Sequence, residues 1–139
     1  MVKFLIVTHG PLAGALKESA RMFFSEQVDC IDTIGLFPGD SVEELKEKIA
    51  SSIQTRYTEE GIMIFVDILS GSPFNSVAMV MNDISQEYPK IECFTGVNLP
   101  ILMEVLAQAE TMPLEEMKKT IEELAPTSIV DVKKALGLE

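Results

Sequence analysis

Apolar runs separated by helix-periodic segments make up most of this chain. The segments Phe4–Val7 and Ile62–Val66 are continuous and rich in β-branched residues, as is typical of strands buried on both faces of a parallel sheet. Two further stretches, Cys30–Phe37 and Ile91–Val97, have strand character. Thr127–Val132 is one more short stretch of this kind. The pattern therefore predicts five strands.

Helical periodicity follows each of the first four predicted strands, and a fifth helix comes directly after the fourth. Ser41 with Glu44 three residues later forms a capping box, and Ser72 before Pro73 predicts an N-cap and a first helical position. The fourth helix is expected from Pro100 to about Ala109. Each of the other four helices has one apolar face, and these faces are, in chain order, Leu12, Leu16, Ala20 and Phe23; Val42, Leu45, Ile49 and Ile53; Phe74, Val77, Met81 and Ile84; and Leu114, Met117, Ile121 and Leu124.

Strict alternation of strands and helices predicts an α/β fold. We expect a doubly wound, mainly parallel sheet with helices on both faces, built as one domain over residues 1–139. In the strand order 2-1-3-4, the chain winds outward in opposite directions from strands one and three, and a ligand crevice opens at their carboxyl ends. The last strand follows two helices, so we expect it antiparallel on an edge of this sheet or on another subunit's edge.

The excess of acidic over basic residues limits the classes of molecule that this protein can bind. The chain has 22 acidic and 11 basic residues and a net charge of −11, which argues against nucleic acid and anionic membrane surfaces. It has no membrane-spanning run and no signal-peptide pattern, so we expect a cytoplasmic protein without direct membrane insertion. Cys30 and Cys93 are expected to be buried free thiols. Without a Cys/His cluster or a nucleotide-binding glycine motif, the sequence indicates neither a metal site nor a cofactor.

Two residues with catalytic potential fall at the predicted crevice. His9, the only histidine, ends the first strand, and Asp67 ends the third. An aspartate that accepts a hydrogen bond from His9 Nδ1–H fixes the tautomer and leaves the Nε2 lone pair free, as a histidine nucleophile requires.

A predicted helix start next to Asp67 suits an anion. Gly71 allows a ligand to approach the backbone closely. Ser72 and the first N–H groups of the helix can hold the oxygens of a phosphoryl group. Phosphoryl transfer needs mostly positioning and electrostatic stabilisation, which one His, one Asp and one helix N-terminus can supply.

Each of these residues also has a purely structural explanation. A lone histidine after a strand is more often hydrogen-bonded than nucleophilic, and Asp67 and Ser72 are good capping residues. Leu12, Phe37 and Phe74 are expected around the crevice, either as core residues or as an apolar rim for a docking protein. On these residues alone, the phosphoryl carrier and the structural interpretation stay equally open.

Four segments resemble the IIA component of the mannose-family sugar phosphotransferase system, and they occur in the family's order. They are Thr8-His9-Gly10; Phe37-Pro38-Gly39-Asp40; Val66-Asp67 followed by Gly71-Ser72-Pro73-Phe74-Asn75; and Gly96-Val97-Asn98-Leu99-Pro100. The resemblance covers nearly the whole chain.

The resemblance implies that His9 takes a phosphoryl group on Nε2 from the phosphocarrier protein HPr and passes it to a histidine of the IIB component. The sugar is then phosphorylated as it enters through the membrane components IIC and IID. Asp67 would orient His9, while Gly71 and Ser72 would hold the phosphate. The resemblance also implies a homodimer in which Thr127–Val132 crosses to the partner's sheet. Because the chain ends near the end of the family domain, we expect a separate IIB protein.

One loop departs from the family pattern. Between Asp67 and Ser72 the family often has a threonine or aromatic residue and two glycines, whereas this chain has Ile68-Leu69-Ser70-Gly71. The change removes a polar contact after Asp67, and we expect it to affect the choice of partner.

Three other functions remain to be weighed. The phosphodonor subunit of a dihydroxyacetone kinase shares this fold and an N-terminal active histidine. A non-catalytic, flavodoxin-like binding module would keep His9 for structure alone. A hydrolase that uses His9 and Asp67 lacks an evident second nucleophile or metal site and ranks last.

Overall fold

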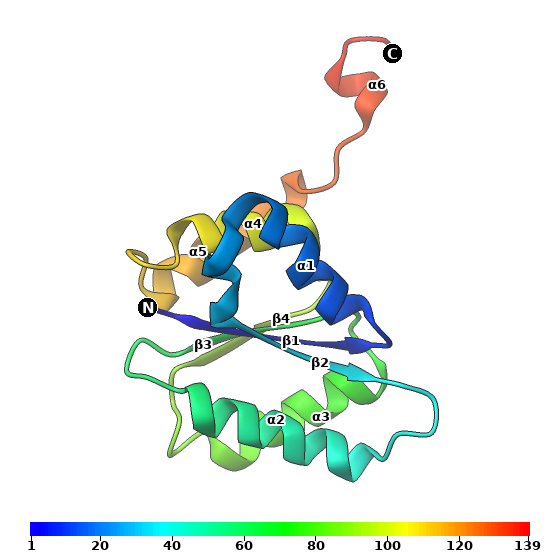
Figure 1. Ribbon diagram of the computed structural model, residues 1–139. Coiled ribbons are helices and arrows are strands. Elements are labelled where there is room, and N and C mark those ends of the chain that lie inside the picture. Colours follow the sequence, from blue (N-terminus) through cyan, green and yellow to red (C-terminus); the bar gives the residue numbers. More distant parts are fainter.

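Four parallel strands form the central sheet of the computed structural model, which describes residues 1–139 (Figure 1). They are β1 (Lys3–His9), β2 (Ile31–Leu36), β3 (Ile62–Val66) and β4 (Ile91–Phe94). Their order is β2-β1-β3-β4, as predicted. Strands β2 and β4 end earlier than expected, because a turn begins at Phe37 and Gly96 adopts a left-handed conformation (φ +71°).

Helices cover both faces of the sheet, which confirms the predicted layers. One face packs against α1 (Leu12–Phe24), α4 (Leu99–Gln108) and α5 (Leu114–Leu124), and the other packs against α2 (Val42–Arg56) and α3 (Gly71–Ile84). The short helices are η1 (Ser25–Cys30), η2 (Ala125–Thr127) and α6 (Val132–Ala135). None of the helices has both the length and the apolar character needed to cross a membrane.

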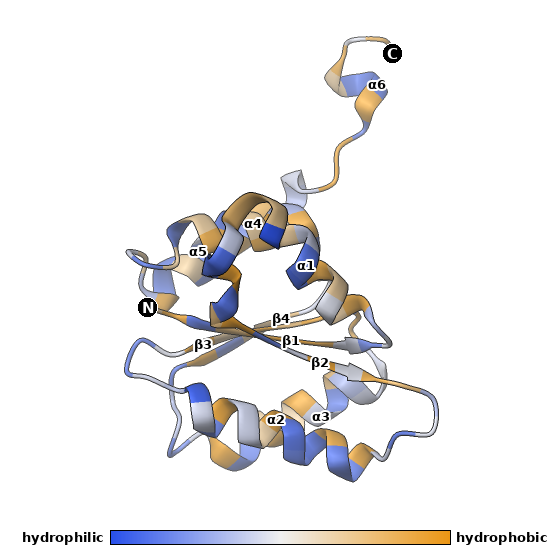
Figure 2. Ribbon diagram, viewed as in Figure 1, coloured by the Kyte–Doolittle hydropathy of each residue, from blue (hydrophilic) through white to orange (hydrophobic).

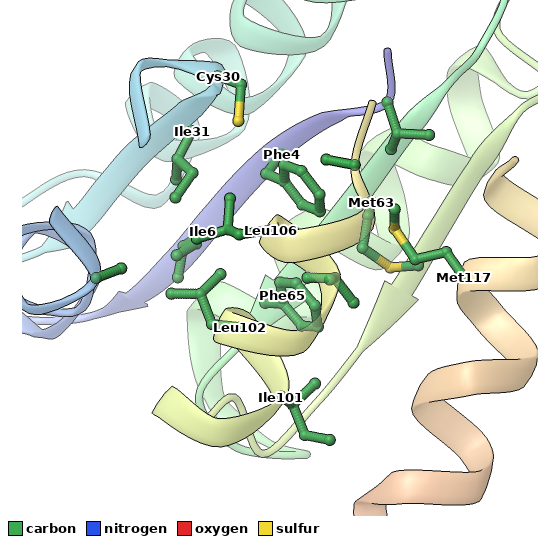
Figure 3. Packing of buried hydrophobic residues seen from close by; sticks show 14 of the residues in the cluster. Phe4, Ile6, Cys30, Ile31, Met63, Phe65, Ile101, Leu102, Leu106 and Met117 are labelled. Carbon is green, nitrogen blue, oxygen red and sulfur yellow. The ribbon is translucent and has the colours of Figure 1, made fainter. Parts of the chain in front are cut away.

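The larger core cluster lies between the sheet and the layer of α1, α4 and α5 (Figure 3). Phe4 of β1 and Phe65 of β3 are fully buried there, together with Leu102 and Leu106 of α4 and Met117 of α5. Full burial of side chains of this size stabilises a fold by roughly 1.5–3 kcal/mol each. The cluster therefore holds β1 and β3 firmly, and with them the ends of both strands.

The second core cluster lies on the opposite face, under α2 and α3. Leu5 and Val7 of β1 and Ile64 of β3 pack there with Ile49 and Ile53 of α2. Because successive side chains of a strand point to opposite faces, β1 and β3 supply both clusters, which explains their unbroken apolar sequences. Figure 2 shows apolar colours along much of the strands, and a mixture of apolar and polar residues along the helices on either side of them.

The start of α3 differs from the prediction, whereas the start of α2 agrees with it. The Ser41 hydroxyl accepts a hydrogen bond from Glu44 N at 3.3 Å and caps α2. Helix α3 begins one residue before Ser72, so Ser72 lies inside the first turn instead of capping it. The N-cap position is Ser70, which has the extended backbone (φ −161°, ψ 168°) of a residue that precedes a helix.

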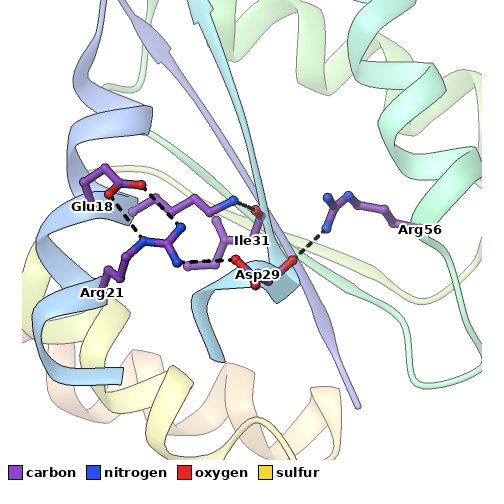
Figure 4. A network of polar contacts seen from close by, with 6 residues as sticks. Glu18, Arg21, Asp29, Ile31 and Arg56 are labelled. Carbon is purple, nitrogen blue, oxygen red and sulfur yellow. Dashed lines mark hydrogen bonds and ion pairs between the residues drawn. The ribbon is translucent and has the colours of Figure 1, made fainter. Parts of the chain in front are cut away.

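Polar contacts link α1 and α2 to the start of β2 (Figure 4). Arg21 on α1 pairs with Glu18 at 3.3 Å and with Asp29 at 3.5 Å. Arg56 at the end of α2 donates to the Asp29 carbonyl, and Lys17 Nζ donates to the first carbonyl of β2 at 2.8 Å. Solvent-exposed pairs of this kind add little stability.

The predicted strand at Thr127–Val132 is wrong for the single chain. The segment leaves η2, passes through bends and enters α6 without pairing to any strand. Ile129 and Val130 are exposed, and Figure 1 shows α6 projecting away from the body. A strand needs a neighbouring backbone edge for its N–H and C=O groups, and this segment reaches none within its own chain.

Both cysteines are free thiols, as expected from the sequence. Cys30 is buried, whereas Cys93 is only half-buried. Burial raises the pKa of both thiols, that of Cys93 to about 12. Both are therefore protonated near neutral pH and poorly reactive as nucleophiles.

Candidate functional site

His9 and Asp67 meet at the carboxyl ends of β1 and β3. His9 is the last residue of β1, and Asp67 directly follows β3. In the parallel register Val7 lies opposite Val66, so the chain leaves both strands at the same edge of the sheet. This is the point where the strand order reverses and where such sheets bind their ligands. The structure thus brings together the two residues that the predicted topology places there.

Asp67 holds His9 through the backbone and through the ring. Its Oδ2 accepts a hydrogen bond from His9 N at 2.9 Å and another from His9 Nδ1 at 2.8 Å. Its Oδ1 accepts one from Ile68 N at 3.0 Å. The Asp67 side chain is 11% exposed and that of His9 is 48% exposed. A nearly buried carboxylate therefore orients an imidazole ring whose other edge is accessible.

These hydrogen bonds determine where the histidine proton sits. Burial raises the pKa of Asp67, but the hydrogen bonds from His9 and Ile68 more than offset it, so the pKa lies below its ordinary value. The ionised Asp67 carboxylate can only accept hydrogen bonds, so the proton of a neutral ring is on Nδ1. The lone pair is then on Nε2, the nitrogen that a nucleophile needs free.

Gly71 lies directly against the His9 ring. A Cβ added to Gly71 would stand 3.1 Å from both Nε2 and Cε1 of His9, which is closer than an ordinary contact. Gly71 also has φ +87°, a conformation that L side chains rarely adopt. Glycine is therefore favoured here by the backbone and by the space that Nε2 requires.

Ser72 lies in the first turn of α3 and is half-buried. The first N–H groups of a helix have no intrahelical acceptor, and the helix dipole adds partial positive charge at this end. The N-cap residue Ser70 makes no side-chain hydrogen bond to them. Because Gly71 touches the His9 ring, these donors lie close to Nε2 and suit an anionic group there.

Thr8 also belongs to the site, although the sequence pattern did not predict a role for it. It is fully buried, and its Oγ1 accepts a hydrogen bond from Ala13 N at 2.9 Å. Gly10, with φ +58°, donates from its N–H to the Leu36 carbonyl at 2.7 Å. The two contacts fix the turn that presents His9. The signal in the sequence was a polar residue at the end of an apolar strand, directly before the histidine.

The three predicted docking residues differ in exposure. Leu12, at the start of α1, is exposed. Phe37 is also exposed, and it follows the residue of β2 that lies opposite His9. Phe74 is half-buried and packs against the core cluster under α2 and α3. Two of the three are therefore available at the surface near the histidine.

Comparison with known proteins identifies the family. The model of the family described as the PTS system fructose IIA component matches residues 3–122. The chain belongs to the mannose-family IIA components. The match runs from β1 into α5 and includes His9, Asp67 and the start of α3. Members of this family are phosphoryl-transfer components of sugar phosphotransferase systems, so the resemblance of the sequence motifs is confirmed.

Relatives of known function agree with this assignment. The fructose-specific EIIA component of Bacillus subtilis (strain 168) is 31% identical over 92% of this chain and 84% of its own length. The mannose-specific EIIAB component of Escherichia coli (strain K12) is 33% identical over 81% of this chain. The match covers 33% of the Escherichia coli protein, so this mannose-family IIA chain resembles one part of it.

Solved structures show the same fold. The mannose/sorbose-specific IIA subunit from Enterococcus faecalis has a TM-score of 0.80 at 18% identity, covering 94% of this chain and 93% of that one. The EIIA component from Streptococcus agalactiae has a TM-score of 0.76 at 24% identity, covering 96% and 99%. These similarities support the α/β architecture of this IIA chain.

Proposed function

We propose that His9 carries the phosphoryl group on Nε2. The observation that supports this most strongly is the pair of hydrogen bonds from His9 to Asp67 Oδ2, which leaves Nε2 free beside Gly71. His9 is also the only histidine of the chain. A phosphoryl carrier of this family needs a residue that can accept the group and release it again, and a phosphohistidine does both.

In the proposed first transfer, the Nε2 lone pair of His9 attacks the phosphorus of a phosphohistidine on HPr. The bond from Nε2 to phosphorus forms as the donor nitrogen–phosphorus bond breaks, and the donor imidazole leaves with that electron pair. The His9 ring gains positive charge, which Asp67 stabilises through Nδ1–H. In the second transfer a histidine of the IIB component attacks the same phosphorus, and His9 leaves as a neutral ring.

The start of α3 holds the phosphoryl oxygens in this proposal. The N–H groups of the first turn, together with the Ser72 hydroxyl, donate hydrogen bonds to them. Gly71 keeps the space beside Nε2 open for the group. Since phosphoryl transfer depends mainly on positioning and charge stabilisation, these groups supply what the carrier itself must contribute.

HPr and the IIB component bind the same face in turn, because both must reach His9 Nε2. Leu12, Phe37 and the half-buried Phe74 are the proposed docking residues around it. The IIB component passes the group to a sugar that enters through the membrane components IIC and IID. This IIA chain therefore acts in the cytoplasm, where it needs neither a metal nor another cofactor.

We also propose a homodimer in which Thr127–Val132 of one chain pairs with β4 of the other. The outer edge of β4 pairs with no strand, and Ile129 and Val130 are exposed on a segment without backbone partners. A cavity of about 190 Å³ lies where the end of β4 meets the start of the tail, and its lining includes Phe94 and Ile129. Truncation before Thr127 should give monomers in sedimentation, and a surviving dimer would reject strand exchange.

The carrier role is tested by the intact mass of the protein after incubation with phosphorylated HPr. The wild type should gain one acid-labile phosphoryl adduct, and His9→Ala should gain none while keeping its circular dichroism spectrum. Transfer from the adduct to a IIB protein supports the sugar system, whereas transfer only to a dihydroxyacetone-binding kinase subunit supports the kinase alternative. No adduct on the wild type, from a donor that phosphorylates another IIA protein, would leave the binding module as the better explanation.

A further inference from the structure

The loop between Asp67 and α3 presents two large apolar side chains to solvent. Ile68 is 50% exposed and Leu69 is 71% exposed. Neither belongs to a core cluster. Exposed apolar residues that form a contiguous patch rimmed by polar residues mark an interaction site.

This loop is fixed at both ends to the histidine site. At one end, Ile68 N donates to Oδ1 of Asp67, whose Oδ2 holds His9. At the other end, Gly71 lies against the His9 ring. Ile68 and Leu69 are therefore held between two residues that contact His9. A protein that brings a group to His9 Nε2 must pass next to these side chains.

The charges at this edge of the sheet favour one kind of partner. The loops 10–11, 37–41, 67–70 and 95–98, which follow the four strands, contain no Lys or Arg, and neither do α3 and α4. Asp40 and Asp67 lie in these loops. These loops thus offer apolar contact and carry acidic but no basic side chains, which complements a partner with an apolar patch among basic residues.

Exposed apolar residues on the neighbouring loops extend the same surface. Leu12 follows the loop after β1, and Phe37 opens the loop after β2. With Ile68 and Leu69 they place apolar side chains on, or directly after, three loops that leave the sheet beside His9. We call these four residues the apolar collar.

We propose that Ile68 and Leu69 are the residues of the apolar collar that determine which phosphohistidine protein this chain accepts. They bind an apolar patch on a basic-faced protein donor and thereby set its affinity, while His9 and Asp67 carry out the transfer. This inference rests on the proposed function of His9. It assigns partner choice to the loop whose composition departs from the family pattern.

The test compares a protein donor with a small one. The double variant Ile68→Ser/Leu69→Ser keeps both backbone N–H groups and should accept phosphoryl from phosphoramidate at the wild-type rate. With phosphorylated HPr, its KM should rise about tenfold or more with little change in kcat, as expected when central apolar contacts are removed from an interface. The conservative variant Ile68→Val/Leu69→Met, which keeps both side chains apolar, should have a KM for phosphorylated HPr close to that of the wild type.

Met79→Ser is the matched control, because Met79 is also 50% exposed but lies in the middle of α3. It should leave the kinetics with both donors unchanged. An unchanged KM for HPr in the double variant would overturn the inference alone. A loss of reaction with phosphoramidate would overturn it as well, because the loop would then act on the chemistry and not on the partner. A wild type that accepts phosphoryl from neither donor would contradict the proposed function itself.

Discussion

At the scale of single residues, Asp67 joins the sheet, the following loop and the histidine. Its two carboxylate oxygens accept three hydrogen bonds, two from His9 and one from Ile68. The bond to His9 N fixes the end of β1, and the bond to Nδ1 fixes the ring. Loss of this one side chain therefore disturbs both the position of the His9 ring and the choice of the ring nitrogen that carries the proton.

The pKa of Asp67 predicts a pH-dependent contribution to stability. Because the folded-state pKa lies below the ordinary value of 3.8, the ionised carboxylate stabilises the fold fully above that value. The stabilisation should be lost as the pH falls through the lower folded-state pKa. Urea unfolding of wild type and Asp67→Asn between about pH 5 and about pH 2.5 measures it.

The difference in unfolding free energy between the two proteins should be constant at the upper end of this range. It should shrink toward the acid end, where Asp67 becomes protonated in the wild type. A difference that stays the same at every pH would mean that the carboxylate charge adds nothing to stability.

Replacement of Gly71 should have two effects, strain in the backbone and crowding of the nucleophilic nitrogen. Gly71→Ala should destabilise the fold by about 1–2 kcal/mol, because φ is +87°. It should also slow phosphorylation of His9 by phosphoramidate about tenfold or more, because the new Cβ lies 3.1 Å from Nε2. Chemical unfolding and intact mass over time measure the two effects.

Gly39→Ala is the control for this prediction. Gly39 has φ +89°, but an added Cβ there would meet nothing within 4 Å. It should cost similar stability and leave the phosphorylation rate unchanged. Equal phosphorylation rates for the two alanine variants would show that Gly71 does not keep the space beside Nε2 open.

At the scale of elements, α3 presents its amino end to the site and buries one polar group without a partner. Ser76, one turn after Ser72, is 1% exposed, and its Oγ makes no hydrogen bond. A buried, unsatisfied hydroxyl costs roughly 1–3 kcal/mol. The helix is otherwise held by apolar contacts to the second core cluster, including those of Val77 and Val80.

Ser76→Ala should therefore stabilise the protein by about 1 kcal/mol, since it removes the unsatisfied hydroxyl and introduces a better helix former. Urea unfolding measures the change. Ser52→Ala is the matched control, because the buried Ser52 hydroxyl donates to Asp32, and this variant should be destabilised. Destabilisation by Ser76→Ala would mean that its hydroxyl has a partner in solution.

At the scale of the whole molecule, the sheet and the site could be predicted because they depend on patterns within the chain. Unbroken apolar runs identified β1 and β3, and alternation with helices indicated a doubly wound sheet, for which we expected the order 2-1-3-4. Once that order is known, His9 and Asp67 must meet, since both end neighbouring parallel strands.

Features that depend on the backbone geometry of a single turn or on contacts between chains could not be predicted. The sequence around Ser72 predicted an N-cap there, yet the residue with the extended backbone of an N-cap is Ser70, and the helix begins at Gly71. Thr8 acts through one hydrogen bond to Ala13, which no periodicity reveals. The pattern at Thr127–Val132 describes a strand that has no partner in its own chain, so a single chain cannot form it.

The most direct test of the account is heteronuclear NMR of protein labelled at the histidine nitrogens, before and after phosphorylation. Because His9 is the only histidine, each ring nitrogen gives one unambiguous signal. The account predicts that the neutral form of the ring carries its proton on Nδ1, and that nitrogen–phosphorus coupling appears at Nε2 after phosphorylation. Coupling at Nδ1, or a neutral ring that carries its proton on Nε2, would contradict it.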